Sequence, residues 1–157
     1  QSMLFYLNME HAYHEGGGHF VQKVLKDQIA EMEKNKHIHT LQRDNAIKLW
    51  ENMTYAVPER FMDHVNENWR LKRTLHDDIT NPKIDAIIQK AYKAGATAQK
   101  VCGAGGGGFL YLLVPKVMQS DVRSALSDLW ELKFVFDKKG VEIIFDSVEE
   151  YAKASIG

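Results

Sequence analysis

The chain has 157 residues, which suits a single domain, and its content of 45% hydrophobic and 26% charged residues is typical of a soluble globular protein. The formal net charge of −1 argues against a nucleic-acid partner, and no apolar run is long enough to span a membrane. The single cysteine, Cys102, excludes an internal disulfide and a thiolate zinc cluster, so we expect a reducing, cytoplasmic location.

The first half of the chain predicts one strand followed by helices. The apolar run "MLFYL" (3–7) predicts the strand, and a polar loop containing glycines follows it. Helical periodicity then gives three apolar stripes, each of which we expect to face the core. These stripes are Val21, Val24, Leu25, Ile29 and Met32; then Ala46, Leu49, Trp50, Met53 and Val57; and then Met62, Val65 and Trp69.

A fourth helix has the clearest boundaries. Asn81 is a favourable N-cap, Pro82 suits the first helical position, and Gly95 is a plausible C-cap. Between these boundaries lies an apolar stripe formed by Ile84, Ile87, Ile88, Ala91 and Tyr92. The helix should therefore begin after Asn81 and end just before Gly95.

The second half of the chain predicts strands. The segments "AQKVC" (98–102) and "FLYLLV" (109–114) predict two strands, and a stripe from Val122 to Trp130 predicts a fifth helix. Alternating apolar residues in 132–136 and 141–145 predict a closing hairpin. The fold class is therefore α+β, with a small, mostly antiparallel sheet covered by helices.

Five glycines and one alanine, "GAGGGG" (103–108), connect the two central strands. The segment satisfies G-x-G-x-x-G, but a dinucleotide-binding loop leads into a helix, and here an apolar strand follows. The Lys-Ser/Thr pair of a Walker loop is also missing. A hairpin turn needs only one or two glycines. Five suggest that a backbone, a phosphate or a sugar passes close to the loop, where successive amides can bind an anion.

The stretch "AGATAQKVCGAGGGGFLYLLVP" (94–115) resembles the third conserved motif of the GHMP kinases, named for galactokinase, homoserine kinase, mevalonate kinase and phosphomevalonate kinase. Within that superfamily the chain most resembles the galactokinase-like branch of fucokinases and kinases of D-glycero-D-manno-heptose 7-phosphate. Further matching positions are Trp69, Lys72, Asn81, Pro82, Ile84, Asp85, Ala94 and Gly95.

The resemblance implies a two-domain enzyme that transfers the γ-phosphate of ATP to a sugar hydroxyl with the help of Mg²⁺. A heptose 7-phosphate is the expected acceptor. The phosphate loop of such kinases, P-x-x-x-G-L-G-S-S-A, belongs to an N-terminal domain and does not occur in residues 1–157. We therefore expect the whole chain to be a C-terminal domain with a ferredoxin-like core elaborated by additional helices. On its own it should be inactive.

The resemblance also implies which residues contribute to the site. It places the glycine loop at the domain interface, near the phosphates and the sugar, through Gly103, Ala104, Gly105, Gly106, Gly107 and Gly108. Lys72 and Arg73 lie in a basic cluster that contacts a sugar phosphate or is simply a solvated face. The resemblance implies no catalytic residue in this chain, because the usual catalytic Asp belongs to the N-terminal domain. No metal ligand is expected either, since the spacing of His11, His14 and His19 fits no metalloprotease motif.

A second hypothesis is a stand-alone small-molecule-binding or regulatory module with the same ferredoxin-like fold. The two hypotheses differ in the surface they predict. Half of a two-domain kinase should expose apolar residues where it meets the missing domain, and the isolated chain could self-associate through that face. A stand-alone module needs no such face. Under either hypothesis, Cys102 is expected to be a small buried hydrophobe in a strand.

Overall fold

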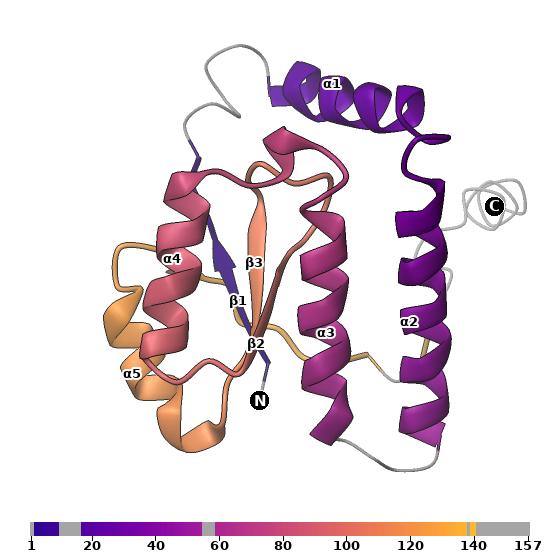
Figure 1. Cartoon of the computed structure of the whole chain (residues 1–157). Helices are drawn as coiled ribbons and strands as arrows, with labels where there is room; N and C mark the ends of the chain where they lie inside the picture. The colour runs from indigo at the N-terminus through magenta and orange to yellow at the C-terminus, as the bar shows by residue number, and fades with distance from the viewer. Residues whose placement is uncertain (1, 10–16, 55–58, 138, 141–157) are drawn as a thin grey trace, which may run out of the picture.

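The computed structural model describes residues 2–9, 17–54, 59–137 and 139–140. The strands in chain order are β1 (Ser2–Tyr6), β2 (Ala98–Val101), β3 (Phe109–Leu113) and β4 (Trp130–Glu131). The helices are α1 (Gly17–Ala30), α2 (Lys36–Thr54), α3 (Glu59–Lys72), α4 (Pro82–Lys93) and α5 (Gln119–Ala125). Two short 3-10 helices, η2 (Asp77–Ile79) and η3 (Lys116–Met118), connect them. Figure 1 shows this arrangement.

The four strands form one antiparallel sheet in the order β2-β3-β1-β4. Phe5 of β1 lies opposite Leu110 of β3, and Leu110 lies opposite Val101 of β2. Helices separate β1 from β2 and β3 from β4. This β-α-β-β-α-β arrangement is the ferredoxin-like topology. The predicted fold class, an α+β domain with a ferredoxin-like core and additional helices, is confirmed.

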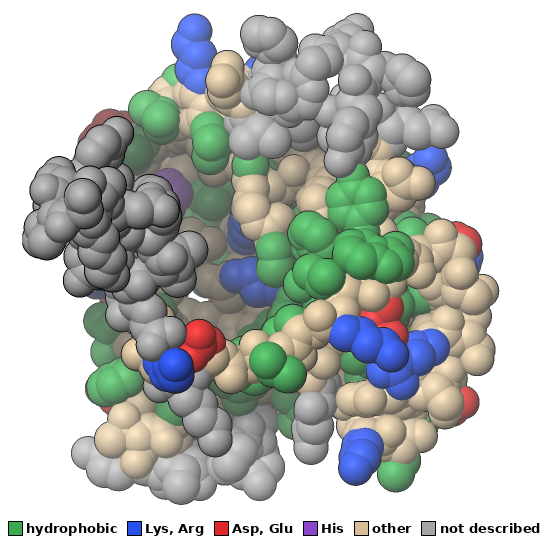
Figure 2. Space-filling view, turned by 180° about the vertical axis from the view of Figure 1, so that it is seen from behind, with side chains coloured by type: hydrophobic (Ala, Val, Ile, Leu, Met, Phe, Trp, Pro, Cys, Tyr) green, Lys and Arg blue, Asp and Glu red, His purple; other side chains and the backbone are tan. Residues whose placement is uncertain are grey.

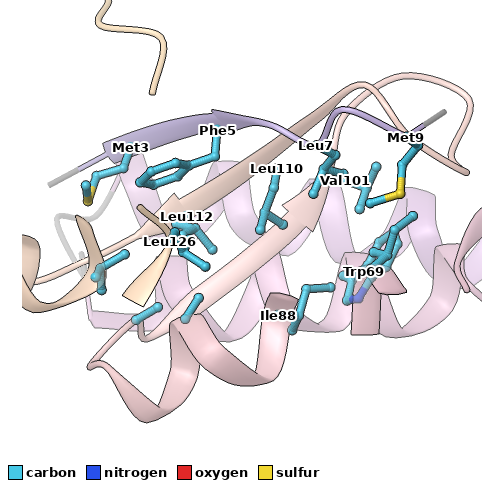
Figure 3. Close-up of a cluster of buried hydrophobic side chains, with 14 of the residues drawn as sticks. Met3, Phe5, Leu7, Met9, Trp69, Ile88, Val101, Leu110, Leu112 and Leu126 are labelled. Atoms are coloured by element: carbon cyan, nitrogen blue, oxygen red, sulfur yellow. The ribbon is translucent and has the colours of Figure 1, made fainter. Parts of the chain in front are cut away.

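One face of the sheet carries the main core. Because side chains alternate along a strand, Met3, Phe5 and Leu110 point to the same side. They pack against α4 and against the C-terminal end of α5, as Figure 3 shows for Ile88 and for Leu126, the residue that follows α5. All of these side chains are buried. The alternating burial of side chains along β1 and β3 is therefore what attaches both helices to the sheet.

Helix α3 covers the edge strand β2. The Asn66 amide Nδ2 donates to the carbonyl oxygen of Thr97 at 3.0 Å, and the amide of Gln99 donates to Asn66 Oδ1 at 3.3 Å. Asn66 thus satisfies backbone groups that a neighbouring strand would otherwise pair, which protects the edge. Figure 2 looks onto the side of the molecule opposite α4 and α5, where basic side chains lie in a hollow beside a group of hydrophobic ones.

The boundaries of α4 agree with the sequence prediction. Asn81 Oδ1 accepts a hydrogen bond from the amide of Ile84 at 3.0 Å, which caps the first turn. Gly95 follows the C-cap residue Ala94 with φ +104°, in the conformation that ends many helices. Ile84 and Ile88 of the predicted stripe are buried. The caps and the apolar stripe together fix both ends of this helix.

The prediction that the first two helical stripes face the core is mostly wrong. Val24 of α1 is buried, but Ile29 is 65% exposed, and Trp50 of α2 is 72% exposed. No described residue of α2 is buried. The reason is that α2 packs on α3 partly through polar side chains, with His64 between Asn45 and Asn52, so its apolar stripe is left uncovered. Val57 lies outside the described residues.

The end of the chain also differs from the prediction. Helix α5 ends at Ala125 instead of continuing to Trp130, which begins β4. The predicted strand over 132–136 is wrong, because regular pairing stops once the Leu132 amide has donated to the carbonyl of Leu4 at 2.8 Å. Beyond that point the rings of Phe134 and Phe136 pack on each other, edge to face, at 5.4 Å. The second arm, 141–145, lies outside the described residues.

Candidate functional site

The glycine loop, residues 103–108, connects β2 to β3 at the end of the sheet that lies under α1 (Figure 1). Its central residues lie against η2. The amide of Gly106 donates to the carbonyl oxygen of Ile79 at 2.9 Å. A Cβ atom at Gly105 would lie 2.7 Å from Ile79 Cα, and Gly105 has φ +115°. The close approach that requires glycine at position 105 is therefore made by the backbone of Ile79 in η2, and not by a ligand.

Two long side chains hold the start of the loop. Gln28 of α1 donates from Nε2 to the carbonyl oxygen of Ala104 at 3.5 Å. Lys72 of α3 donates from Nζ to the carbonyl oxygen of Gly103 and, at 3.4 Å, to that of Val101. These carbonyls are thereby turned toward the protein. The loop is held by α1, α3 and η2, which are far from it in sequence.

Several loop amides are left without an acceptor. In the described part of the chain, the backbone N–H groups of Ala104, Gly105 and Gly107 donate no hydrogen bond. The amides of Ala104 and Gly105 are consecutive, and Gly105 has positive φ; successive free amides in such a turn can form a nest that binds an anion. The loop can therefore bind a phosphate through its backbone, and it offers no acid or base from a side chain.

The two predicted basic contacts, Lys72 and Arg73, point in different directions. Lys72 reaches the glycine loop, as described above. Arg73 donates to Asp85 Oδ2 at 2.8 Å and lies over the Trp69 ring at 6.0 Å, so it connects α3 to α4. The structure therefore brings Lys72, and not Arg73, to the glycine loop.

The environment of Lys72 shows a second lysine that the sequence analysis missed. Burial of the Lys72 side chain, and then repulsion by Lys100, lowers the pKa of its ammonium group below the ordinary 10.5. Lys100 of β2 donates from Nζ to Asn68 Oδ1 at 3.2 Å. The signal was present in the sequence, because Lys100 belongs to the glycine motif and strand alternation places it on the face opposite Val101.

Two other expectations concern Cys102 and metal ligands. Cys102 is partly exposed and follows the last residue of β2, so the prediction of a buried strand residue is wrong. Among the described residues, no group of three His, Cys, Asp or Glu side chains is placed to hold a metal ion. His11, His14 and the side chain of His19 lie outside what the structure describes. No helix within the described ranges combines the length and apolar character needed to cross a membrane.

Comparison with known proteins identifies related kinases. A family model described as "GHMP kinases C terminal" matches residues 53–132. D-glycero-alpha-D-manno-heptose 7-phosphate kinase from Campylobacter jejuni is 25% identical over 124 residues, which are 78% of this chain and 36% of that relative. The chain thus spans little more than a third of the relative's length.

Solved structures show the same fold at low identity. The Lin0012 protein from Listeria innocua matches with a TM-score of 0.65 and 13% identity over 88% of this chain and 39% of its own. The L. major mevalonate kinase, solved with R-mevalonate, matches with a TM-score of 0.62 and 17% identity over 83% of this chain and 42% of its own. Because the family model covers just over half of the chain, from the last turn of α2 to the end of β4, the chain belongs to the GHMP kinases and corresponds to their C-terminal domain.

Proposed function

We propose that this chain is the C-terminal part of an ATP-dependent sugar or sugar-phosphate kinase whose acceptor is a heptose 7-phosphate. The observation that carries the proposal is the glycine loop, which is held in place by its own chain while the amides of Ala104, Gly105 and Gly107 have no acceptor among the described residues. The name of the Campylobacter jejuni relative supports the choice of acceptor. In the intact enzyme the γ-phosphate of ATP would pass to a hydroxyl of the sugar.

In this proposal the chain positions the reactants. Phosphoryl transfer depends mainly on alignment and on stabilising charge, and preorganised backbone amides provide both. The catalytic base and the ATP loop would come from an N-terminal domain. Mg²⁺ would be held there and by the phosphates, since the described residues of this chain offer no cluster of three ligands. The isolated chain is therefore expected to be inactive.

Lys72 and Arg73 remain proposed substrate contacts, with different requirements. The ammonium group of Lys72 lies beside the loop and can contact a phosphate without leaving its place. Arg73 would first have to leave Asp85, to which it is bound at 2.8 Å. Lys72 is thus the better candidate for a phosphate contact.

The exposed apolar side chains of α1 and α2 support a further part of the proposal. Ile29, Trp50 and Met53 are 65%, 72% and 59% exposed, more than a domain without partners usually leaves uncovered along two successive helices. We propose that another part of the kinase covers them, and that the isolated chain self-associates through them. A cytoplasmic location, expected from the single cysteine, belongs to the same proposal.

The test is to express the full reading frame and the 157-residue chain separately, and to measure ADP release with a panel of sugars and sugar phosphates. We expect the full-length protein to phosphorylate a heptose 7-phosphate with ATP and Mg²⁺, and the isolated chain to be inactive. Turnover by the isolated chain would show that the catalytic groups lie within it. A full-length protein inactive on every sugar and sugar phosphate would exclude the kinase function.

One observation favours a second function, a stand-alone small-molecule-binding or regulatory module. The glycine loop is fixed by contacts from Gln28, Lys72 and Ile79, so it needs no second domain to keep its shape. A module of this kind should be monomeric, bind no hydrophobic dye and bind a metabolite. A kinase half should associate and bind the dye, which can be measured by light scattering and dye fluorescence.

A further inference from the structure

Two lysines lie together beside the glycine loop. Lys72 comes one helical turn after Asn68 on α3, so both side chains leave the same face of the helix. Lys100 extends from the neighbouring strand β2 and donates to Asn68 Oδ1 at 3.2 Å. Lys72 in turn donates to the carbonyls of Val101 and Gly103. The two ammonium groups are thus held at the junction of α3, β2 and the loop.

Among the described residues, neither lysine is paired with a carboxylate, and the sulfur of Cys102, when ionised, is the one opposing charge that acts on Lys72. Within the described ranges, all the hydrogen-bond acceptors of Lys72 and Lys100 are uncharged: two backbone carbonyls and the Asn68 amide oxygen. Lys23, Arg73 and Arg123, by contrast, each pair with a carboxylate. A cation removed from water without a counter-charge costs free energy, and a second cation nearby adds to the cost.

The lowered pKa of the Lys72 ammonium group agrees with this arrangement. Burial is the larger cause of its lowered pKa, and repulsion by Lys100 adds to it. Despite this cost, the ammonium group of Lys72 donates to the carbonyl oxygens of Val101 and Gly103. An anion placed against both lysines would relieve the repulsion and replace the missing counter-charge.

We propose that Lys72 and Lys100 form the binding site for the phosphate ester group that the sugar acceptor already carries. The inference rests on the proposed kinase function and gives this phosphate a place of its own, beside the loop amides that would face the transferred phosphate. A phosphate monoester is a compact anion with several oxygens, so it can accept hydrogen bonds from both ammonium groups at once. ATP phosphates have the same chemistry, and the experiments below separate the two sources.

The first experiment tests the anion site in the 157-residue chain alone. Inorganic phosphate is titrated at constant ionic strength while the lysine side-chain resonances are followed by NMR. We expect saturable shifts at Lys72 and Lys100 and a rise in the pKa of Lys72, with no shift at the exposed Lys83 on α4. Shifts of equal size at all three lysines, or none at Lys72 and Lys100, would overturn the proposal.

Variants make the test specific. Lys100→Met removes one cation whose only hydrogen bond within the described residues is to Asn68, so the fold should be retained. We expect it to weaken phosphate binding by about tenfold or more, as the loss of a charge-assisted hydrogen bond implies. The matched control Lys83→Met should leave binding unchanged. Equal affinities of the two variants would contradict the site. Lys72→Arg, which keeps the charge, should retain part of the affinity.

The second experiment uses the full-length kinase and identifies which phosphate is bound. Lys100→Met should raise KM for the heptose 7-phosphate about tenfold while KM for ATP stays unchanged. A rise in KM for ATP alone would assign the lysines to the nucleotide and overturn the proposal. If the kinase uses only unphosphorylated sugars, the proposed acceptor fails as well, while the titration of the isolated chain still reports on the anion site separately.

Discussion

Replacing Gly105 by alanine tests how the glycine loop is held. The new Cβ would lie 2.7 Å from Ile79 Cα, and 3.0 Å from both Ile79 Cγ2 and the Ile79 carbonyl oxygen. Two of these atoms belong to the backbone of η2, so no side-chain rotation can make room. The next residue, Gly106, donates to the same Ile79 carbonyl at 2.9 Å. Any movement that relieves the clash would therefore also disturb this hydrogen bond.

The expected cost has two parts. At φ +115° an alanine is strained by about 1–2 kcal/mol relative to glycine. Overpacking against η2 adds about 1–3 kcal/mol. We therefore expect Gly105→Ala to lower the free energy of unfolding by about 2–5 kcal/mol. Gly103→Ala is the matched control, because Gly103 also has positive φ, +84°, but no heavy atom lies within 4 Å of its Cβ position.

Equilibrium unfolding in urea measures both variants directly. Gly103→Ala should lose only the backbone part, about 1–2 kcal/mol, so the difference between the two variants gives the packing against Ile79. In the full-length kinase, Gly105→Ala should also lower kcat more than Gly103→Ala does, since it displaces the loop amides. Costs that agree within about 0.5 kcal/mol would refute the argument, because they would show that η2 does not constrain the loop.

Three smaller predictions concern local features. Gly107→Ala should cost less than Gly105→Ala in the same unfolding experiment, because its Cβ would meet Met9 Cβ at an ordinary 3.4 Å and Gly107 is not among the positive-φ residues. Asn81→Ala should cost about 1 kcal/mol by removing the N-cap of α4, measured in the same way. Arg123 donates to both carboxylate oxygens of Glu131 at 2.8 and 2.9 Å, and this hydrogen bonding lowers the pKa of Glu131. The pair thus stabilises the fold above the ordinary pKa of glutamate and loses its effect as the pH falls through the lowered one. Arg123→Ala should reduce Tm at pH 7, by the equivalent of about 0.2–1 kcal/mol, and the difference should shrink steadily as the pH is lowered and Glu131 becomes protonated.

The parts of the fold that the sequence predicted well depend on local patterns. Asn81 and Gly95 define α4 because capping uses atoms within a few residues of the helix ends. The strands on either side of the glycine loop were predicted because apolar runs such as "FLYLLV" are visible within one segment. Short-range chemistry of this kind can be read without knowing what lies across the core.

The predictions that failed concern which part of the protein packs against a given face of a helix or strand. The apolar stripe that includes Trp50 has the correct helical period, but periodicity does not say whether another element covers the stripe. Lys72 and Arg73 were treated as one basic cluster, although successive residues on a helix point about 100° apart. One therefore reaches the glycine loop and the other reaches α4. Lys100 was missed because its neighbour Lys72 lies 28 positions away, and only the packing of α3 on β2 brings them together.

The glycine loop combines flexible residues with a fixed position. A segment of five glycines would be costly to order if a ligand or a second domain had to fix its shape, since glycine loses the most conformational freedom. Here the loop becomes ordered when the domain folds, because Gln28, Lys72 and Ile79 each form a hydrogen bond that holds part of the loop or of the strand before it. The anchors use the carbonyls of Gly103 and Ala104 and the amide of Gly106. Within the part of the chain that the structure describes, they leave the amides of Ala104, Gly105 and Gly107 without an acceptor. A phosphate would then bind to a site that is already ordered, so little binding free energy would be lost to ordering the loop. Backbone amides are most effective in phosphoryl transfer when they are preorganised in this way.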